Sequence, residues 1–306
     1  MTKSRFAEKW TAVRKHASAY VLLIIPLGYF IIFKYFPLIN AQIAFKDFSP
    51  LDGVFRSRWS GFEHFRMFFS SFYFSELIRN TLFYSFAKLL VGVPIAVLFA
   101  VALSESRSKF LRKIVQTISY VPHFLSWVIM LGILLMLLSP GEGLINKVLQ
   151  SLGKQPISFL TNPKTFPLVV ILSDLWKELG WSAIIFLAAL LGIDPTLYEA
   201  ASAEGASRLQ RVLYITLPSI LPVVMVVVLL RLGTILDAGF HQIFILYSTP
   251  VLSVADIIDT WVYRQGILDF QFSLATAVGL FKGVIGMVLL LCANWMIRRI
   301  NGTSLY

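Results

Sequence analysis

Six runs of apolar residues, each long enough to cross a lipid bilayer, run through this 306-residue sequence. A helix needs about 20 such residues to span the hydrocarbon layer. Backbone N–H and C=O groups find no water inside lipid, so spans of this kind are helices rather than strands. The sequence therefore predicts an all-α integral membrane protein with six transmembrane helices. The predicted spans cover residues 18–38, 79–103, 115–138, 166–192, 216–237 and 274–297.

The composition agrees with a membrane protein. Hydrophobic residues make up 57% of the chain and charged residues only 14%, whereas about a quarter of a soluble domain is charged. A single cysteine, Cys292, excludes an internal disulfide framework. The N-terminus is basic and then apolar, as a signal peptide is, but the apolar run is long and no small-residue cleavage site follows it. The first run is therefore predicted to be an uncleaved span.

The loop charges predict an orientation. The N-terminal tail, the loops at 104–114 and 193–214 and the C-terminus hold thirteen Lys and Arg, against eight in the other three loops. Because cationic loops stay in the cytoplasm, both termini are predicted to be cytoplasmic. The expected domains are a basic tail (1–17), a transmembrane domain (18–298) with a cytoplasmic loop (194–214), and a short C-terminus (299–306). The cations are spread over short loops, so no nucleic-acid partner is expected.

The stretch YEAASAEGASRLQRVLYITLP, residues 198–218, lies on the predicted cytoplasmic side. Asp194 and Pro195 form a good helix start, since Asp caps free N–H groups and Pro suits the first helical position. Gly205 can end this helix in the left-handed conformation, and Ser207 can cap a second helix. Small side chains would let the first helix lie in a groove of another protein. A plain solvated connector is the alternative.

The same stretch resembles the cytoplasmic motif of the inner-membrane permease subunits of binding-protein-dependent ABC importers. That motif is Glu-Ala-Ala, three residues, Gly, nine residues, then Ile-x-Leu-Pro. Here Glu199, Ala200, Ala201, Gly205 and the run Ile215 to Pro218 match every fixed position and both spacings. The segments 237–244, 254–260 and 275–282 are similar to the branch that imports complex saccharides, as are Gly61-Phe62-x-x-Phe65 and Asn80-Thr81. Glu204 departs from the family, which often carries Asp there.

The resemblance implies a type I ABC importer permease fold in a bacterial cytoplasmic membrane. It also implies a second homologous permease subunit, two ATPase subunits and an extracytoplasmic solute-binding protein. ATP and Mg would lie in the ATPase partners, and this chain, which lacks a phosphate-binding Gly-x-x-x-x-Gly-Lys motif, would bind no cofactor itself. The residues assigned to ATPase coupling are Glu199, Ala200, Ala201, Gly205 and Ala206, with Pro218 starting the fifth span.

Charged residues within or close to the spans are the candidates for a substrate pathway, because such charges usually face a bundle interior or a water-filled cavity. Asp174, Glu178 and Trp181 share one helical face by their spacing, with Lys177 beside them. Carboxylates and aromatic rings suit a sugar, and interhelical salt bridges are the alternative. Cationic residues in the pathway would suit an acidic, uronate-containing oligosaccharide. The full set of candidates is Asp174, Lys177, Glu178, Trp181, Arg231, Asp237 and Lys282; Lys88 is a further charge within a span, and His123 and Trp127 are interface anchors or substrate contacts.

Other classes of protein fit the sequence less well. An ion-coupled secondary transporter would use the intramembrane charges as a relay, but no inverted repeat is visible and the cytoplasmic motif argues against it. A permease for another organic solute, such as glycerol phosphate, is the nearer alternative. No metal-ligand spacing and no nucleophile–base pair is readable, so an enzyme is not expected. The aromatic loop at 39–78 is either an interfacial belt or a surface that docks an extracytoplasmic partner.

Overall fold

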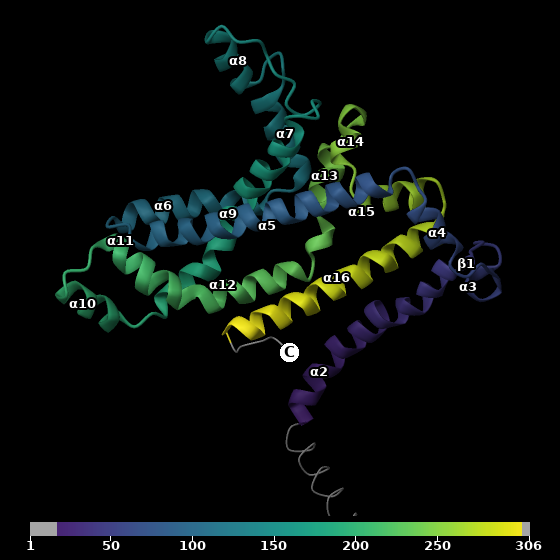
Figure 1. Ribbon diagram of the computed structural model, residues 1–306, viewed down its shortest axis with the longest axis horizontal. Coiled ribbons are helices and arrows are strands. Elements are labelled where there is room, and N and C mark those ends of the chain that lie inside the picture. The colour runs from purple at the N-terminus through teal and green to yellow at the C-terminus, as the bar shows by residue number, and fades with distance from the viewer. Residues whose placement is uncertain (1–16, 302–306) are drawn as a thin grey trace, which may run out of the picture.

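The computed structural model describes residues 17–301, so most of the predicted basic tail and the last five residues lie outside the described part. Most of the described residues are helical (Figure 1). The one sheet that the described residues form is a two-stranded hairpin in which Lys46 pairs with Trp59 and Asp47 with Arg58. The prediction of an all-α fold is confirmed, with this small hairpin as an addition.

The helices of the described region follow one another along the chain, and the longest segment between two of them, residues 152–165, separates α8 from α9. In chain order the elements are α2 (Ala17–Phe30), η1 (Ile31–Tyr35), η2 (Phe36–Phe45), β1 (Lys46–Asp47), α3 (Gly53–Arg56), β2 (Arg58–Trp59), α4 (Glu63–Phe69), α5 (Phe74–Ser104), α6 (Lys109–Tyr120), η3 (Val121–Phe124), α7 (Trp127–Leu138), α8 (Leu144–Ser151), α9 (Phe166–Leu191), α10 (Pro195–Ala203), α11 (Arg208–Arg211), η4 (Val212–Thr216), α12 (Leu217–Leu232), η5 (Ile235–Asp237), α13 (Phe240–Leu246), η6 (Thr249–Val251), α14 (Leu252–Ala255), α15 (Ile258–Tyr263), η7 (Arg264–Leu268) and α16 (Phe272–Asn301). Here η1, η4 and η7 are π-turns and the other η elements are 3-10 turns.

Four helical segments are long and apolar enough to cross a membrane, and two bent helix pairs bring the number to six. The four segments are Tyr20–Phe45, Phe74–Ser104, Arg208–Leu232 and Phe272–Met296. The bent pairs are Lys109–Phe124 with Trp127–Leu138 and Phe166–Leu191 with Pro195–Ala203. Each predicted span therefore has a counterpart, although the fifth ends at Leu232 rather than at residue 237.

The third predicted span, residues 115–138, consists of two helices rather than one continuous helix. The chain bends by 112° between α6 and α7. Pro122 lies in the 3-10 turn η3, Leu125 is extended, and the Ser126 hydroxyl caps α7 by accepting from the N–H of Ile129 at 3.3 Å. A proline lacks a backbone donor and a Ser cap starts a new helix, so these residues favour two helices over one. Figure 1 shows α7 leaving the bundle at a steep angle to α6.

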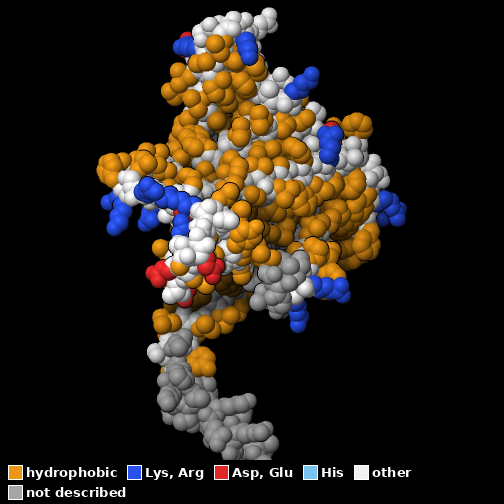
Figure 2. All heavy atoms as spheres, turned by 60° about the vertical axis from the view of Figure 1, so that its left-hand side comes forward, with side chains coloured by type: hydrophobic (Ala, Val, Ile, Leu, Met, Phe, Trp, Pro, Cys, Tyr) orange, Lys and Arg blue, Asp and Glu red, His pale blue; other side chains and the backbone are white. Residues whose placement is uncertain are grey.

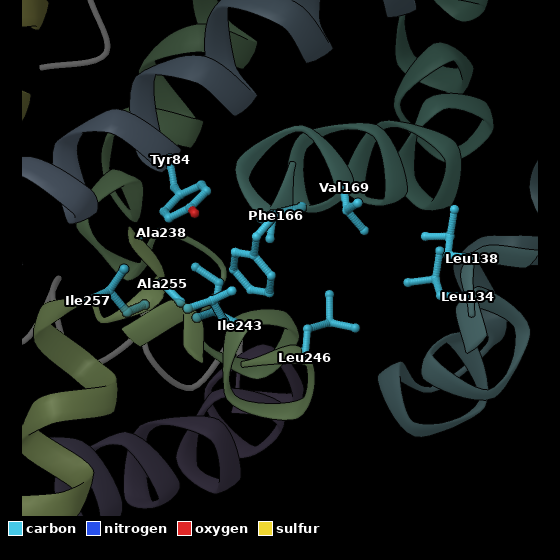
Figure 3. Packing of buried hydrophobic residues seen from close by; sticks show 12 residues of the cluster. Tyr84, Leu134, Leu138, Phe166, Val169, Ala238, Ile243, Leu246, Ala255 and Ile257 are labelled. Atoms are coloured by element: carbon cyan, nitrogen blue, oxygen red, sulfur yellow. The ribbon is translucent and has the colours of Figure 1, made fainter. Parts of the chain in front are cut away.

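Three apolar clusters hold the bundle together. In the first, side chains of α5, α7, α9 and α13 converge around Phe166, which is fully buried (Figure 3). The second joins α5, α9 and α12 around Phe186, and the third joins α4, α5, α15 and α16 around Phe68. Helices α6 and α9 approach so closely that a Cβ on Gly180 would lie 2.2 Å from the carbonyl oxygen of Ser119. Only glycine fits at that crossing.

The outer surface is apolar, as lipid contact requires. Helix α2 exposes large side chains on all sides; Leu22, Ile24 and Ile25 are 74%, 64% and 77% exposed. Hydrophobic side chains also cover most of the face seen in Figure 2. A soluble protein rarely exposes so large a contiguous apolar area. The surface therefore suits a bundle embedded in a bilayer.

Candidate functional site

The first candidate site is the exposed corner between α10 and α11. The Asp194 carboxylate accepts from the N–H of Thr196 at 2.9 Å and caps α10, with Pro195 in the first position. That backbone hydrogen bond lowers the pKa of the Asp194 carboxyl. Gly205 follows α10 with a φ of +80°, and Ser207 forms a reciprocal capping box with Gln210. The predicted helix start, glycine turn and second cap are all confirmed.

Helix α10 is slim and open to its surroundings. None of its nine residues is buried. Glu199, Ala200 and Gly205 are exposed, while Ala201 and Ala206 are half-buried and help line a hollow of about 320 Å³ on the inner side of the corner. Acidic side chains gather at the front of Figure 2, which looks toward the end of the molecule that carries α10. The corner thus presents small and acidic side chains to whatever covers it.

Pro218 lies inside a continuous helix rather than at its start. The helix runs from Arg208 to Leu232, and Pro218 is in the first turn of its α12 part. A proline cannot donate to the carbonyl four residues earlier, which here belongs to Tyr214. The chain widens into the π-turn η4 over Val212–Thr216 just before this position. Such a turn is how a helix accommodates a local loss of its regular bonding.

The second candidate site is a charged cavity of about 310 Å³ among α5, α9, α12 and the non-α-helical segment 233–239 that follows α12. Four of the predicted pathway residues line it: Asp174, Glu178, Arg231 and Asp237. Lys88 lines it as well. The remaining lining residues are Ser85, Leu89, Thr234, Ile235, Ala238 and Gly239. Both signs of charge therefore face one polar cavity within the spans.

Most of these charges are paired. The Lys88 amino group lies 3.2 Å from the Asp174 carboxylate and donates to the carbonyl of Ala238 at 3.1 Å. Lys282, outside the cavity lining, donates to Asp237 at 2.6 Å and to both carboxylate oxygens of Asp259. Paired charges are the form in which ionic groups persist in low-dielectric surroundings.

Arg231 differs from the two lysines. Its guanidinium donates to the Ser182 hydroxyl at 2.6 Å, and no carboxylate within salt-bridge distance of it is found among residues 17–301. Arg231 therefore lines the cavity without an ion-pair partner among the described residues, although three carboxylates line the same cavity. A guanidinium binds carboxylates with two parallel hydrogen bonds, so this group suits an anionic ligand.

Three of the predicted pathway residues on α9 hold the break between α6 and α7. The Lys177 amino group donates to the carbonyls of Pro122, His123 and Leu125 at 3.2, 2.5 and 2.7 Å. Glu178 lies 3.0 Å from the His123 ring nitrogen, and Trp181 stacks on the same ring at 4.4 Å. Lys177 and Trp181 do not line the cavity. Of the three residues predicted to share a helical face, Glu178 and Trp181 contact His123 at the break, and Asp174 pairs with Lys88.

Several residues of the site were not among the sequence candidates. Lys88 is visible in the sequence as a charge within a span, whereas Asp259 lies outside every predicted span. Gln242, which accepts from Lys88 and donates to the Val170 carbonyl at 2.7 Å, is a neutral residue within the segment 237–244 that resembles the saccharide branch. No group of three or more His, Cys, Asp or Glu side chains that could hold a metal ion occurs in the described part of the chain.

These features define a class of protein: a multi-pass helical membrane protein with a polar cavity among its spans and a short exposed helix between two of them. Residues 92–302 match the family described as "Binding-protein-dependent transport system inner membrane component", and the chain belongs to that family. It is a membrane permease component of ABC transporters and not a catalytic subunit. The family that the motif at 199–218 predicted is therefore confirmed.

Individual relatives cover almost the whole chain. The protein is 41% identical to "Protein LplB" of Bacillus subtilis (strain 168), over 97% of this chain and 94% of LplB. It is 39% identical to the "Polygalacturonan/rhamnogalacturonan transport system permease protein YteP" of the same organism, over 94% and 89% of the two chains. Among solved structures, a chain of a bacterial alginate ABC transporter in complex with an alginate pentasaccharide-bound periplasmic protein is 40% identical, with a TM-score of 0.89 over 97% of this chain and 99% of that one. The type I importer permease fold is confirmed.

Proposed function

We propose that this protein is one permease subunit of an ATP-driven importer of oligosaccharides, including acidic ones. The observation that carries the proposal is the capped, exposed helix α10 with its glycine corner, placed between two spans and carrying the full motif from Glu199 to Pro218. In this role α10 seats in a separate ATPase subunit, whose ATP-driven closure moves the spans. The chain supplies half of the pathway and hydrolyses no ATP itself.

The partners of this assembly follow from the same role. A second, homologous permease completes the pathway, two ATPase subunits hold ATP and Mg, and an extracytoplasmic binding protein delivers the saccharide. Both termini and α10 lie in the cytoplasm, in keeping with the loop charges. The coupling residues are Glu199, Ala200, Ala201, Gly205 and Ala206, followed by Pro218. The residues assigned to the pathway are Asp174, Glu178, Arg231 and Asp237 in the cavity. Lys282 anchors Asp237, and Lys177 and Trp181 contact the break between α6 and α7.

Affinity purification tests the assembly. A tagged chain is expressed with its neighbouring genes, solubilised in mild detergent, and its partners are identified by mass spectrometry. We expect a second permease and an ATPase to co-purify and to give ATP-dependent saccharide uptake in liposomes with the binding protein. A chain that purifies alone and still catalyses ion-coupled uptake would instead be a secondary transporter.

The acidic substrate class rests on Arg231. The relative YteP is named for polygalacturonan and rhamnogalacturonan transport. A second similar solved structure, 41% identical, is described as a bacterial ABC transporter involved in the import of the acidic polysaccharide alginate. Arg231 is the lining cation without a carboxylate partner among the described residues, whereas Lys88 is bound to Asp174. A uronate carboxylate would supply the partner that Arg231 lacks.

We therefore expect Arg231→Gln to lower uptake of an oligogalacturonate about tenfold or more, because a charge-assisted hydrogen bond contributes about 1.5–3 kcal/mol. Uptake by Arg231→Lys should fall less, since the charge remains. Lys164→Gln is the control, because it removes a cation that has no part in the cavity. Equal uptake by Arg231→Gln and the control, at equal expression, would remove Arg231 from the substrate site.

A further inference from the structure

The corner between α10 and the helix that begins at α11 is tied together by side chains. Its backbone turns at Gly205, which has a φ of +80° and no neighbouring atom within 4 Å of the place where a Cβ would lie. A glycine in open space is the natural pivot of such a turn. If the backbone alone held the corner, α10 could swing about Gly205 without moving α12.

Four side-chain hydrogen bonds close a ring across this corner. The Arg211 guanidinium donates to the Ser202 hydroxyl at 2.8 Å, and that hydroxyl donates to the Tyr198 carbonyl at 2.6 Å. The Tyr198 hydroxyl lies 3.0 Å from the Thr216 hydroxyl, which in turn points at the Arg211 carbonyl at 3.4 Å. Either hydroxyl can be the donor of the bond between Tyr198 and Thr216.

The ring joins α10 to the second helix at two separate heights. Ser202 and Arg211 meet near the exposed tip of the corner, and Tyr198 and Thr216 meet near its base. Thr216 is only 2% exposed and ends the π-turn that leads into α12. Two side-chain contacts at separate positions along the two helices prevent α10 from rotating about Gly205 alone, so a displacement of α10 also moves the buried start of α12.

We infer that Tyr198, Ser202, Arg211 and Thr216 are positioning residues for energy coupling: they make the corner a rigid lever between the ATPase-docking helix and the fifth span. The inference rests on the proposed coupling role of α10. None of the four residues belongs to the fixed positions of the motif at 199–218. Their function is to transmit movement, whereas docking itself is left to the exposed surface of α10.

The test is the number of saccharide molecules imported per ATP hydrolysed, measured with the complete complex and its binding protein in proteoliposomes. Tyr198→Phe and Thr216→Val each remove one hydroxyl while keeping the shape of the side chain, and Ser202→Ala removes the tie at the tip. Tyr214→Phe is the matched control, because Tyr214 is 77% exposed and its hydroxyl takes no part in the ring. Co-purification of the ATPase verifies that each variant still assembles.

We expect the imported amount per ATP to fall about threefold in Tyr198→Phe, the effect of losing one ordinary hydrogen bond, with the complex intact. The double variant Tyr198→Phe/Thr216→Val should be no worse than Thr216→Val alone, since Thr216→Val already removes the contact that Tyr198→Phe removes. A ratio equal to that of Tyr214→Phe, or additive losses in the double variant, would overturn the lever. A proportional fall of assembly, ATPase rate and uptake would also overturn it, because that pattern belongs to a merely structural role. If the wild-type protein neither binds an ATPase nor imports saccharide, the proposed function fails instead.

Discussion

Gly205→Arg should reduce saccharide uptake to the level of vesicles without permease, while the protein still inserts into the membrane. Gly205 has a φ of +80°, and an L-residue in this left-handed region costs about 1–2 kcal/mol. The space around it is open, so the new side chain clashes with nothing inside the chain. The damage comes from the tilt of α10 and from a bulky cation on the surface that we propose as the ATPase contact. Uptake and ATPase co-purification are the measurements.

Gly153→Arg is a closely matched control for this variant. Gly153 has a φ of +73° and likewise no atom near a Cβ, but it lies in the loop after α8, far along the chain from the corner. Gly153→Arg introduces a similar backbone strain at a different place in the fold, so uptake should be retained. Gly205→Asn should keep part of the activity, because Asn tolerates the left-handed region better than other residues. Equal uptake by Gly205→Arg and Gly153→Arg would exclude the corner from coupling.

Features decided by near neighbours in the sequence could be predicted. The start of α10 at Asp194 and Pro195, the turn at Gly205 and the capping box of Ser207 each involve residues at most three positions apart. Capping and turn rules are local rules, so sequence is sufficient for them. The spans could be predicted for the same reason, since the length and hydrophobicity of each apolar stretch indicate by themselves that it crosses the bilayer.

Features that depend on distant contacts could not be predicted. Pro122 marks a bend in the third span, but the size of the bend depends on Lys177, which lies 55 positions away and satisfies carbonyls that a continuous helix would have satisfied itself. The face shared by Asp174, Glu178 and Trp181 follows from helical spacing. Their partners come from elsewhere: Lys88 for Asp174 and His123 for the other two. The spacing of residues along a helix predicts which side chains point the same way, but it does not predict which residues of other helices they contact.

Lys282→Met should destabilise the protein and abolish uptake. The Lys282 ammonium group donates to two carboxylates. It lies 2.6 Å from Asp237, in the segment 233–239 after α12, and 2.7 and 2.9 Å from the two oxygens of Asp259 on α15. Removing it leaves the largely buried Asp259 unpaired; breaking a buried pair costs about 3–5 kcal/mol, and the exposure of Asp237 places this variant at the lower end. The loss also removes the contact that fixes the segment 233–239, which forms one wall of the cavity. Thermal unfolding in nanodiscs and uptake at equal expression measure the two effects.

A second substitution separates the charge from the shape of Lys282. In Lys282→Met/Asp259→Asn the unpaired buried charge is gone, so much of the lost thermal stability should return, since the cost lies in the orphaned carboxylate. Uptake should stay low, because Asp237 is still unanchored beside the cavity. Lys147→Met, an exposed lysine on α8, is the control and should change neither quantity. If Lys282→Met unfolds like this control, Lys282 does not anchor the segment 233–239; if the double variant restores uptake as well, the lysine serves stability alone.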